Sequence, residues 1–395
     1  MTRVVFLTHS GADSGAEQSI VGYLSRWPEA SSRPLMVLGE HGALEERARS
    51  LGVDHVVEAL DSAASGTRRE ERRIGRILGA ATGLVRHSSK ARRVLRERSA
   101  DVVVAIGFKS LVFGWLAARR ARATIVWSLH DRVHHEYFAW FMVPVLRYLA
   151  PRLVDGLLVN SSSTLATVRP GRTPVLVATP GIRLDPRPFD GPHDEVRRVV
   201  MIGRLSPWKG QDLFLRAFAD TFGQTVGSSP AHAYVVGDAL FGEDAYAAGL
   251  RDLAEQLGIA DRVHFTGHVR DPWEQLVEAD VLVHCSRIPE PFGQVVVQGL
   301  WARCAVVAAK PGGPAEVITD GVDGLLVPCG DEAALARALQ RLRDDAGLRC
   351  RLAERGRETA APYDVSHTAP QLAAWLADLH AGRLKPRSVA DVRQR

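Results

Sequence analysis

Two cations stand close together after an apolar run in the second half of the chain. Arg204 follows the run Val199–Gly203, and Lys209 comes five residues later, at the expected start of the next helix. Two positive charges at a helix N-terminus oppose the helix dipole unless an anion binds there. A pyrophosphate would satisfy both, and the same cations would stabilise charge on a departing diphosphate. The alternative is that both are exposed cations on a surface loop.

A carboxylate and a second tight turn follow two other apolar runs. Glu290 lies in the Pro-flanked turn Pro289–Gly293, after the run Val281–Cys285 and before a helical pattern. Ligands of open α/β sheets bind at the carboxyl ends of strands, so this carboxylate would face a ligand. Pro311–Glu316 is another tight turn at a strand end. Either turn on its own could equally be built for shape alone.

A glycine-bearing loop, His9–Glu17, also separates the first apolar run from a helical pattern. Its backbone N–H groups and the positive helix end suit a phosphate, with Gly15 inside the loop. The loop lacks the GxGxxG fingerprint of dinucleotide-binding folds, which argues against an NAD-dependent dehydrogenase.

The elements that must position these residues are strands and helices in alternation. Short Val/Ile/Leu-rich runs separated by helical patterns predict an α/β fold of two Rossmann-like, doubly wound parallel sheets facing across a cleft. The first half contributes the expected strands Arg3–Thr8, Pro34–Gly39, Asp101–Gly107, Thr124–His130, Gly156–Asn160 and Pro174–Thr179. The second half contributes Val199–Gly203, Ala233–Gly237, His264–Gly267, Val281–Cys285, Ala305–Ala309 and Gly324–Val327.

The expected domains follow from a Pro-rich stretch between the halves, with three prolines in residues 180–188. We expect a first domain over residues 1–185, a linker over 186–198 and a second domain over 199–365. A C-terminal helix over residues 366–384, packing back on the first domain, and a basic tail over 385–395 complete the chain.

Composition excludes several classes of protein. With 46% hydrophobic and 24% charged residues in 395, the chain is neither disordered nor fibrous. The four cysteines form no CxxC pair, which argues against a disulfide scaffold or zinc knuckle and fits a reducing compartment. No apolar stretch reaches the roughly 20 residues of a membrane span. The expected location is the cytoplasm, with peripheral contact at the inner face of the membrane as an option.

Positive charge is concentrated in residues 66–99, which hold 11 basic and 3 acidic side chains. A basic amphipathic helix there would contact anionic lipid or an acidic substrate. The alternative is a solvated helix in an Arg-rich protein, since Arg outnumbers Lys 45 to 5. Nucleic acid is not expected, because the segment lacks aromatic residues for stacking.

An aromatic stretch over residues 134–149 has two interpretations as well. Tyr137, Phe138, Trp140 and Phe141 could form an acceptor-binding wall or a lipid contact. Alternatively, the stretch is a helix packed into the domain core.

Taken together, these features resemble glycosyltransferase family 4, the retaining, bacterial-type nucleotide-sugar glycosyltransferases of GT-B fold. The resemblance covers most of the chain and rests on five motifs in the family's order. They are Ser14-Gly15-Ala16-Glu17, Leu129-His130-Asp131, Gly203-Arg204-Leu205 with Lys209-Gly210, Glu290-Pro291-Phe292-Gly293, and Gly312-Gly313-Pro314-Ala315-Glu316 leading to Gly321–Pro328.

The resemblance implies a role for each matching residue. Arg204 and Lys209 would clamp the donor diphosphate, and Glu290 would hydrogen-bond hydroxyls of the donor sugar. Gly15 would let the N-terminal loop approach the diphosphate, and His130 would lie beside the reacting carbon. Three further donor contacts are implied, made by the backbone around Phe292 and Gly293 and, toward the base, around Val269.

One position departs from the family pattern. The second glutamate of the family motif, eight positions after the first, is Gln298 here. The side chain of Gln298 would accept the hydrogen bond from a ribose hydroxyl without a negative charge, which would lower the donor affinity by about 1 kcal/mol.

The expected function is therefore retaining transfer of a hexose from a nucleotide-diphosphate sugar, with UDP or GDP as the nucleotide, to an unidentified lipid or small-molecule acceptor. No cofactor and no metal are expected, because the chain has no Asp-x-Asp pair and the family needs none. The alternatives are a nucleotide-sugar 2-epimerase of the same fold and a catalytically silent nucleotide-sugar-binding module, which Gln298 would explain.

Overall fold

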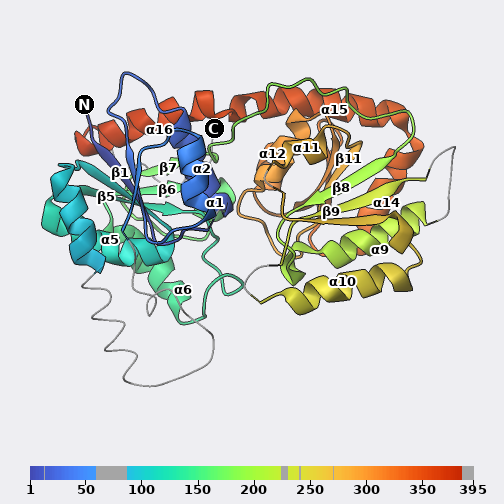
Figure 1. Ribbon diagram of the computed structural model, residues 1–395, viewed down its shortest axis with the longest axis horizontal. Coiled ribbons are helices and arrows are strands. Elements are labelled where there is room, and N and C mark those ends of the chain that lie inside the picture. Colours follow the sequence, from blue (N-terminus) through green and yellow to red (C-terminus); the bar gives the residue numbers. More distant parts are fainter. Residues whose placement is uncertain (13, 59–86, 224–229, 240–241, 270, 385–395) are drawn as a thin grey trace. The chain divides into compact units, whose positions relative to one another are not determined.

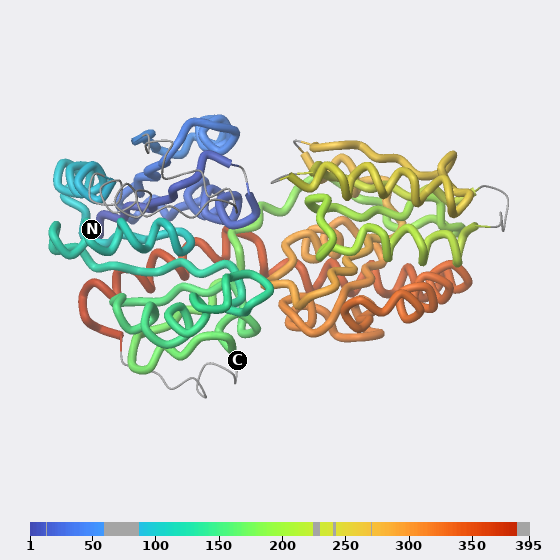
Figure 2. Tube along the Cα trace, turned by 90° about the horizontal axis from the view of Figure 1, so that it is seen from below, coloured from blue at the N-terminus to red at the C-terminus, as the bar shows by residue number. Residues whose placement is uncertain are grey.

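The computed structural model describes residues 1–12, 14–58, 87–223, 230–239, 242–269 and 271–384. It consists of two compact units, of which the first comprises Met1–Arg183 and Val365–Arg395 and the second Leu184–Asp364 (Figure 1). The chain therefore passes from the first unit to the second and returns to the first with its last described helix, which is red in Figure 2.

The first unit is built on a seven-stranded, wholly parallel sheet in the order β3-β2-β1-β4-β5-β6-β7. Six of these strands lie where the sequence predicts them. The short β3 was not predicted, because three residues between polar neighbours give no apolar run. The strands are β1 (Val4–Thr8), β2 (Leu35–Leu38), β3 (His55–Val57), β4 (Val102–Ile106), β5 (Thr124–Leu129), β6 (Gly156–Val159) and β7 (Val175–Val177).

Both faces of this sheet are buried, as continuous apolar strands require. Consecutive residues of one strand, such as Phe6 and Leu7, point to opposite faces and belong to two different core clusters. Figure 1 shows α1, α2 and α16 on one side of the sheet and α5 on the other. The helices are α1 (Gly15–Ser25), α2 (Ala43–Ser50), α5 (Gly107–Ala121), α6 (Met142–Pro144), the π-helical η1 (Val145–Leu149), α7 (Ala150–Leu153), α8 (Ser162–Leu165) and α16 (Val365–His380).

The second unit has a six-stranded parallel sheet in the order β10-β9-β8-β11-β12-β13. All six strands were predicted. They are β8 (Arg198–Ile202), β9 (His232–Val236), β10 (Val263–Gly267), β11 (Val281–His284), β12 (Ala305–Lys310) and β13 (Leu325–Pro328). In both sheets the strand order reverses next to the first strand, between β1 and β4 and between β8 and β11. Open α/β sheets bind their ligands at such a reversal.

Helices cover both faces of the second sheet, with α11, α12 and α15 on one side and α9, α10 and α14 on the other (Figure 1). Asp331 and Asp345 begin α14 and α15 by accepting hydrogen bonds from backbone N–H groups. The helical elements are η2 (Pro207–Lys209), α9 (Gln211–Phe222), α10 (Asp244–Gln256), η3 (Ala260–Arg262), α11 (Trp273–Leu276), α12 (Gln294–Trp301), α13 (Pro314–Val317), α14 (Glu332–Asp344), α15 (Ala346–Ala360) and η4 (Ala361–Tyr363).

The stretch expected as a linker, residues 186–198, is counted with the second unit. Phe189 is buried, and the backbone N–H of His193 donates to the buried Asp280 at 2.6 Å. The C-terminal helix α16 belongs to the first unit, where Leu372 and Leu376 enter the core and the helix contacts α1.

Two other stretches need comment. Of the basic segment 66–99, residues 66–86 lie outside the described residues, and 87–97 are helical. In the aromatic stretch, Leu146 is buried but Trp140 and Phe141 are 80% and 61% exposed. The interpretation as a core helix is therefore correct for one face only. No helix among the described residues is long and apolar enough to cross a bilayer.

Candidate functional site

The two predicted cations of the second unit lie in the loop between β8 and α9. Lys209 ends the 3₁₀ turn η2, and α9 begins two residues later at Gln211, so Lys209 precedes the helix. Between them Gly210 has a φ of +81°, and a Cβ there would lie 2.5 Å from the carbonyl oxygen of Cys285. The N–H of Arg287 donates to the carbonyl of Trp208 at 2.7 Å. The loop is thus fastened to the end of β11.

Lys209 forms a nearly buried ion pair with Glu290. Its Nζ lies 2.8 Å from Oε2 of Glu290, and the side chains are 18% and 11% exposed. Ser286 Oγ donates to the same oxygen at 3.0 Å, and His284 Nε2 lies 3.2 Å from it. Oε2 therefore has three partners, whereas Oε1 has no hydrogen-bond partner among the described residues. The ammonium also lies 4.3 Å from the centre of the Trp208 ring.

The Glu290 carboxyl stays ionised in this setting. Burial on its own would raise the pKa of Glu290, but the charge of Lys209 and the hydrogen bond with His284 outweigh it and hold the pKa far below its usual range. The cluster therefore combines a fixed negative oxygen with an ammonium group at the reversal of strand order between β8 and β11.

Glycines bring a second loop against the Glu290 turn. Gly313 N–H donates to the carbonyl of Glu290 at 2.8 Å. A Cβ at Gly313 would lie only 2.3 Å from Cα of Phe292, so only glycine allows this approach. Gly293 precedes α12 with a φ of +86°. Phe292 is buried, and its ring lies 6.1 Å from that of Tyr363.

The other predicted donor contacts belong to the same unit. Arg204 follows β8, and its guanidinium lies 5.9 Å from the Trp208 ring. Gln298, in the second turn of α12, is half-buried, and its side chain has no hydrogen-bond partner among the described residues. Val269 is half-buried in the loop after β10.

Three residues of this cluster were missed by sequence reasoning. Trp208 supports the ammonium of Lys209, while His284 and Ser286 hold the carboxylate of Glu290. A signal for the last two was present: they are two residues apart at a strand end, so the strand period places them on one side.

The predicted histidine belongs to the first unit. His130 follows β5, its Nε2 lies 2.8 Å from Ser128 Oγ, and its carbonyl accepts from Asn160 Nδ2 at 2.9 Å. Burial lowers its pKa to about 4, so the imidazole is neutral at pH 7. A neutral ring whose Nε2 is engaged by Ser128 still has Nδ1 to donate or accept a single hydrogen bond toward a ligand.

The N-terminal glycine also lies in the first unit, as the first residue of α1. The nearby Glu17 is buried, and its carboxylate accepts from Thr8 Oγ1 at 3.2 Å and from Ser14 Oγ. Glu17 therefore ties the loop that contains Gly15 to the end of β1.

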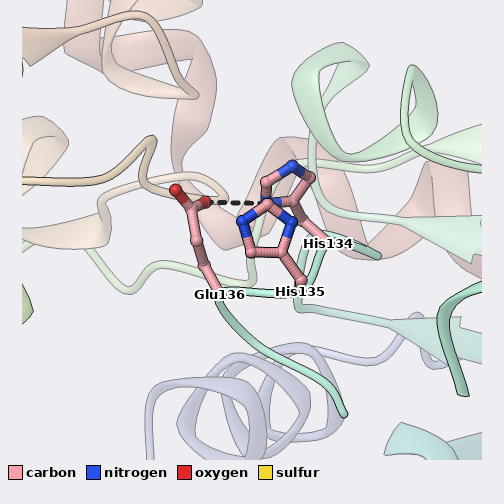
Figure 3. A group of neighbouring side chains, drawn as sticks. All are labelled: His134, His135 and Glu136. Carbon is pink, nitrogen blue, oxygen red and sulfur yellow. Dashed lines mark ion pairs between the residues drawn. The ribbon is translucent and has the colours of Figure 1, made fainter. Parts of the chain in front are cut away.

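Among the described residues, one group of side chains could hold a metal ion. His134, His135 and Glu136 offer ligand atoms within 4.8 Å of one another (Figure 3). His134 Nδ1 lies 3.0 Å from Glu136 Oε2, and the side chains stand in a partly exposed loop. This contact brings His134 and Glu136 together, and the rings of His134 and His135 lie against each other with their centroids 3.8 Å apart.

Comparison with known proteins was informative over most of the chain. Residues 187–359 match the family "Glycosyl transferases group 1", and residues 43–186 match "Glycosyltransferase Family 4". A D-inositol 3-phosphate glycosyltransferase of Stackebrandtia nassauensis is 34% identical over 284 residues, which is 65% of this chain and 63% of that protein. The lipopolysaccharide core glycosyltransferase LpsD of Rhizobium meliloti is 36% identical over 161 residues, or 41% of this chain and 43% of that protein. The matches thus span less than two thirds of these relatives.

Solved structures resemble the whole chain. Anabaena HepE in complex with UDP and glucose has a TM-score of 0.79 at 26% identity, covering 96% of this chain and 100% of that one. Sucrose-phosphate synthase from Thermosynechococcus elongatus has a TM-score of 0.74 over 97% of this chain, and at 18% identity it shows the fold alone. The two parallel sheets, the two family matches that together cover residues 43–359 and the likeness to HepE show that the chain belongs to glycosyltransferase family 4 and has the GT-B fold.

Proposed function

We propose that the protein is a retaining glycosyltransferase that moves a hexose from a nucleotide-diphosphate sugar to an acceptor. One observation carries the proposal. Glu290 keeps one carboxylate oxygen saturated by Lys209, His284 and Ser286, while Oε1 is open to a ligand. A carboxylate oxygen fixed in this way accepts hydrogen bonds from sugar hydroxyls.

The diphosphate would bind beside it. The Lys209 ammonium has three N–H donors and uses one on Glu290, so the others are available to a phosphate. Arg204, at the end of β8, would supply the second positive charge. The backbone of Phe292 and Gly293 directly precedes α12, whose N-terminus favours an anion. Two cations and a helix end give the leaving group enough positive charge to dispense with a metal ion.

The step we propose breaks the bond between the anomeric carbon and the diphosphate oxygen. The acceptor oxygen attacks the same face, and its proton passes to an oxygen of the departing diphosphate. Lys209 and Arg204 stabilise the charge that develops there, an effect worth about 10²-fold or more in rate. His130, neutral at pH 7, is assigned a hydrogen bond near the reacting carbon, Gly15 an approach to the diphosphate and Val269 a backbone contact to the base.

UDP is the nucleotide we propose, with GDP as the alternative. HepE, with the highest TM-score among the structures compared above, was solved with UDP-glucose as well as with UDP and glucose. The acceptor is proposed only as a class, a lipid-linked or small-molecule hydroxyl. The names of the relatives mention both an inositol phosphate and a lipopolysaccharide core.

Calorimetric titration of the full chain, without added metal, against UDP, GDP, ADP and TDP and their sugar conjugates tests the proposal. We expect one nucleotide to bind, and Lys209→Ala to weaken it at least tenfold. Arg216, an exposed cation of α9, supplies the matched control, and Arg216→Ala should bind as the wild type does. Absence of binding to every nucleotide would overturn the proposal, as would equal losses in the two variants.

A silent sugar-nucleotide-binding module is the second candidate, favoured by Gln298 alone. The free amide of Gln298 stands where the family has a carboxylate. Gln298→Glu should tighten binding of the nucleotide by about tenfold, since a charged acceptor strengthens the bond to a ribose hydroxyl. Hydrolysis of the donor sugar by the wild type, followed by release of nucleotide, would exclude a silent module. Its absence with every donor that binds would favour one.

A further inference from the structure

The first unit exposes a concentration of large apolar side chains. Ten such side chains are strongly exposed among the described residues, and six of them fall between Trp140 and Leu153. We call these six the apolar face: Trp140, Phe141, Val145, Tyr148, Leu149 and Leu153. Their exposed fractions run from 43% for Leu153 to 80% for Trp140. Scattered exposed apolar residues are ordinary, whereas a contiguous group of this kind indicates an interaction site.

Helical geometry makes the group contiguous. The elements α6, η1 and α7 follow one another without interruption from Met142 to Leu153. Val145, Tyr148, Leu149 and Leu153 are spaced by three or four residues, so they share one side of this helix. Leu146 and Ala150 of the same helix are buried in the core, so the helix has apolar residues both inside the protein and at its surface. Exposed apolar residues grouped beside such a buried stripe indicate an interaction site.

The helix lies against the C-terminal part of α5. Trp115 Nε1 and Arg119 Nη2 both donate to the carbonyl of Leu153, at 2.8 and 3.0 Å. Val112, on the same helix as these two residues, is also exposed. The apolar face therefore continues toward α5, which lies next to α6 in Figure 1.

All formal charges of these two helical stretches are positive. Residues 107–122 contain Lys109, Arg119, Arg120 and Arg122, and residues 137–153 contain Arg147 and Arg152, without one Asp or Glu in either stretch. Arg147 is used inside the protein, where it donates to the carbonyls of Thr167 and Val133. Arg119 pairs with Asp155 at 3.2 Å, whereas Lys109, Arg120, Arg122 and Arg152 are exposed at their positions.

From this combination we propose that the apolar face docks on an anionic lipid bilayer, with the helix lying in the plane of the interface. Trp and Tyr side chains favour the level of the lipid headgroups, and Phe, Val and Leu favour the acyl boundary beneath it. Each basic side chain near an anionic surface adds about 1 kcal/mol of attraction. A second copy of the chain fits less well, because two such faces would bring positive charges together. The proposal is independent of the glycosyl transfer proposed above.

Sedimentation of the full chain with vesicles tests this. We expect binding to vesicles of phosphatidylcholine with 30% phosphatidylglycerol, weaker binding to phosphatidylcholine alone, and loss of binding as salt rises. The double variant Phe141→Ser/Leu149→Ser should lower the vesicle partition coefficient at least tenfold. Val322→Ser is the matched control, because Val322 is an exposed apolar residue of the second unit, 53% accessible. It should partition as the wild type does.

A spectroscopic measurement secures the result against misfolding. Trp140 fluorescence, taken as the difference between the wild type and Trp140→Phe, should shift to shorter wavelength when anionic vesicles are added. Light scattering after gel filtration reports the oligomeric state. The proposal is overturned if neither vesicle binds, if the double variant binds unchanged, or if the double variant converts a dimer to a monomer while vesicles have no effect. The last result would assign the apolar face to contact with a second copy of the chain.

Discussion

Removing the Lys209 charge tests whether the cluster around Glu290 is as interdependent as its geometry indicates. Lys209→Met keeps the length and apolar contacts of the side chain but leaves the Glu290 carboxylate with only Ser286 and His284 as partners. Breaking a buried ion pair from one side costs about 3–5 kcal/mol. Because the side chains of Lys209 and Glu290 are still 18% and 11% exposed, we expect a cost at the lower end of this range, about 3 kcal/mol at pH 7.

The pH dependence of that cost follows from the lowered pKa of Glu290. A carboxyl whose folded pKa lies below its unfolded value of 4.5 stabilises the fold above that value, and the contribution is lost as pH falls toward the folded pKa. Without Lys209, burial raises the pKa of Glu290. As the pH falls, the carboxyl of the folded variant therefore takes up a proton and no longer needs a counter-charge. The difference in unfolding free energy between wild type and variant should therefore shrink from pH 7 to pH 4.

Urea titration read by hydrogen exchange of peptides from β8 and β11 reports on the second unit by itself. Glu290→Gln/Lys209→Met should be more stable than Lys209→Met, since the double variant removes both charges. Arg355→Met breaks an ion pair with Glu358 that is 65% and 68% exposed, and it should cost less than about 1 kcal/mol. The reasoning would be refuted if Lys209→Met lowered the free energy of unfolding by as little as Arg355→Met does, and by the same amount at pH 7 and pH 4.

Three further predictions concern other parts of the two units. Because burial lowers the pKa of His130 to about 4, its NMR ring resonance, assigned by His130→Gln, should not titrate between pH 7.5 and 5.5, and a midpoint near 6.5 would contradict its burial. Gly313→Ala should destabilise the second unit in urea by about 2 kcal/mol or more through the contact with Phe292, whereas Gly249→Ala, with nothing within 4 Å, should be neutral or stabilising. Removal of divalent metals with EDTA should leave transfer unchanged. If EDTA instead lowers the transfer rate of the wild type, if one metal ion restores that rate, and if the His134→Ala variant is insensitive to EDTA, then a metal would be assigned to the loop that contains His134.

The sequence predicted the architecture well because strand periodicity is local. Twelve of the thirteen strands among the described residues were visible as apolar runs, since helices cover both faces of each sheet and most residues of such a strand are apolar. The exception, β3, has three half-buried residues, so its pairing with β2 depends on tertiary contacts and not on its own pattern. Likewise, residues 186–198 look like a linker in composition, but Asp280 binds them to the second unit through contacts more than 80 residues apart in sequence.

The site was predicted less completely, because its chemistry depends on pairs far apart in the chain. Lys209 and Glu290 were both selected, one for a phosphate and one for a sugar, but their 81-residue separation hid the ion pair between them. Nor did composition show that Trp140 and Phe141 point outward while Leu146 points inward, since all three are apolar. A helix pattern predicts which residues share a side, and only packing decides which side is covered.

The pairing of Lys209 with Glu290 has a consequence for how the donor would bind. Each residue orients the other before any ligand arrives, so the free protein has already met the entropic cost of fixing two flexible side chains. Gly210 and Gly313 supply the close backbone approaches that hold the two loops, and neither tolerates a Cβ. A donor that binds to Oε1 of Glu290 and to the remaining N–H groups of Lys209 would then find both partners in place. Gln298 belongs to no such arrangement among the described residues, so its side chain would have to be ordered by the ligand itself. Substitutions at Gln298 should therefore change donor affinity with little effect on stability, whereas substitutions at Lys209 or Glu290 should change both together.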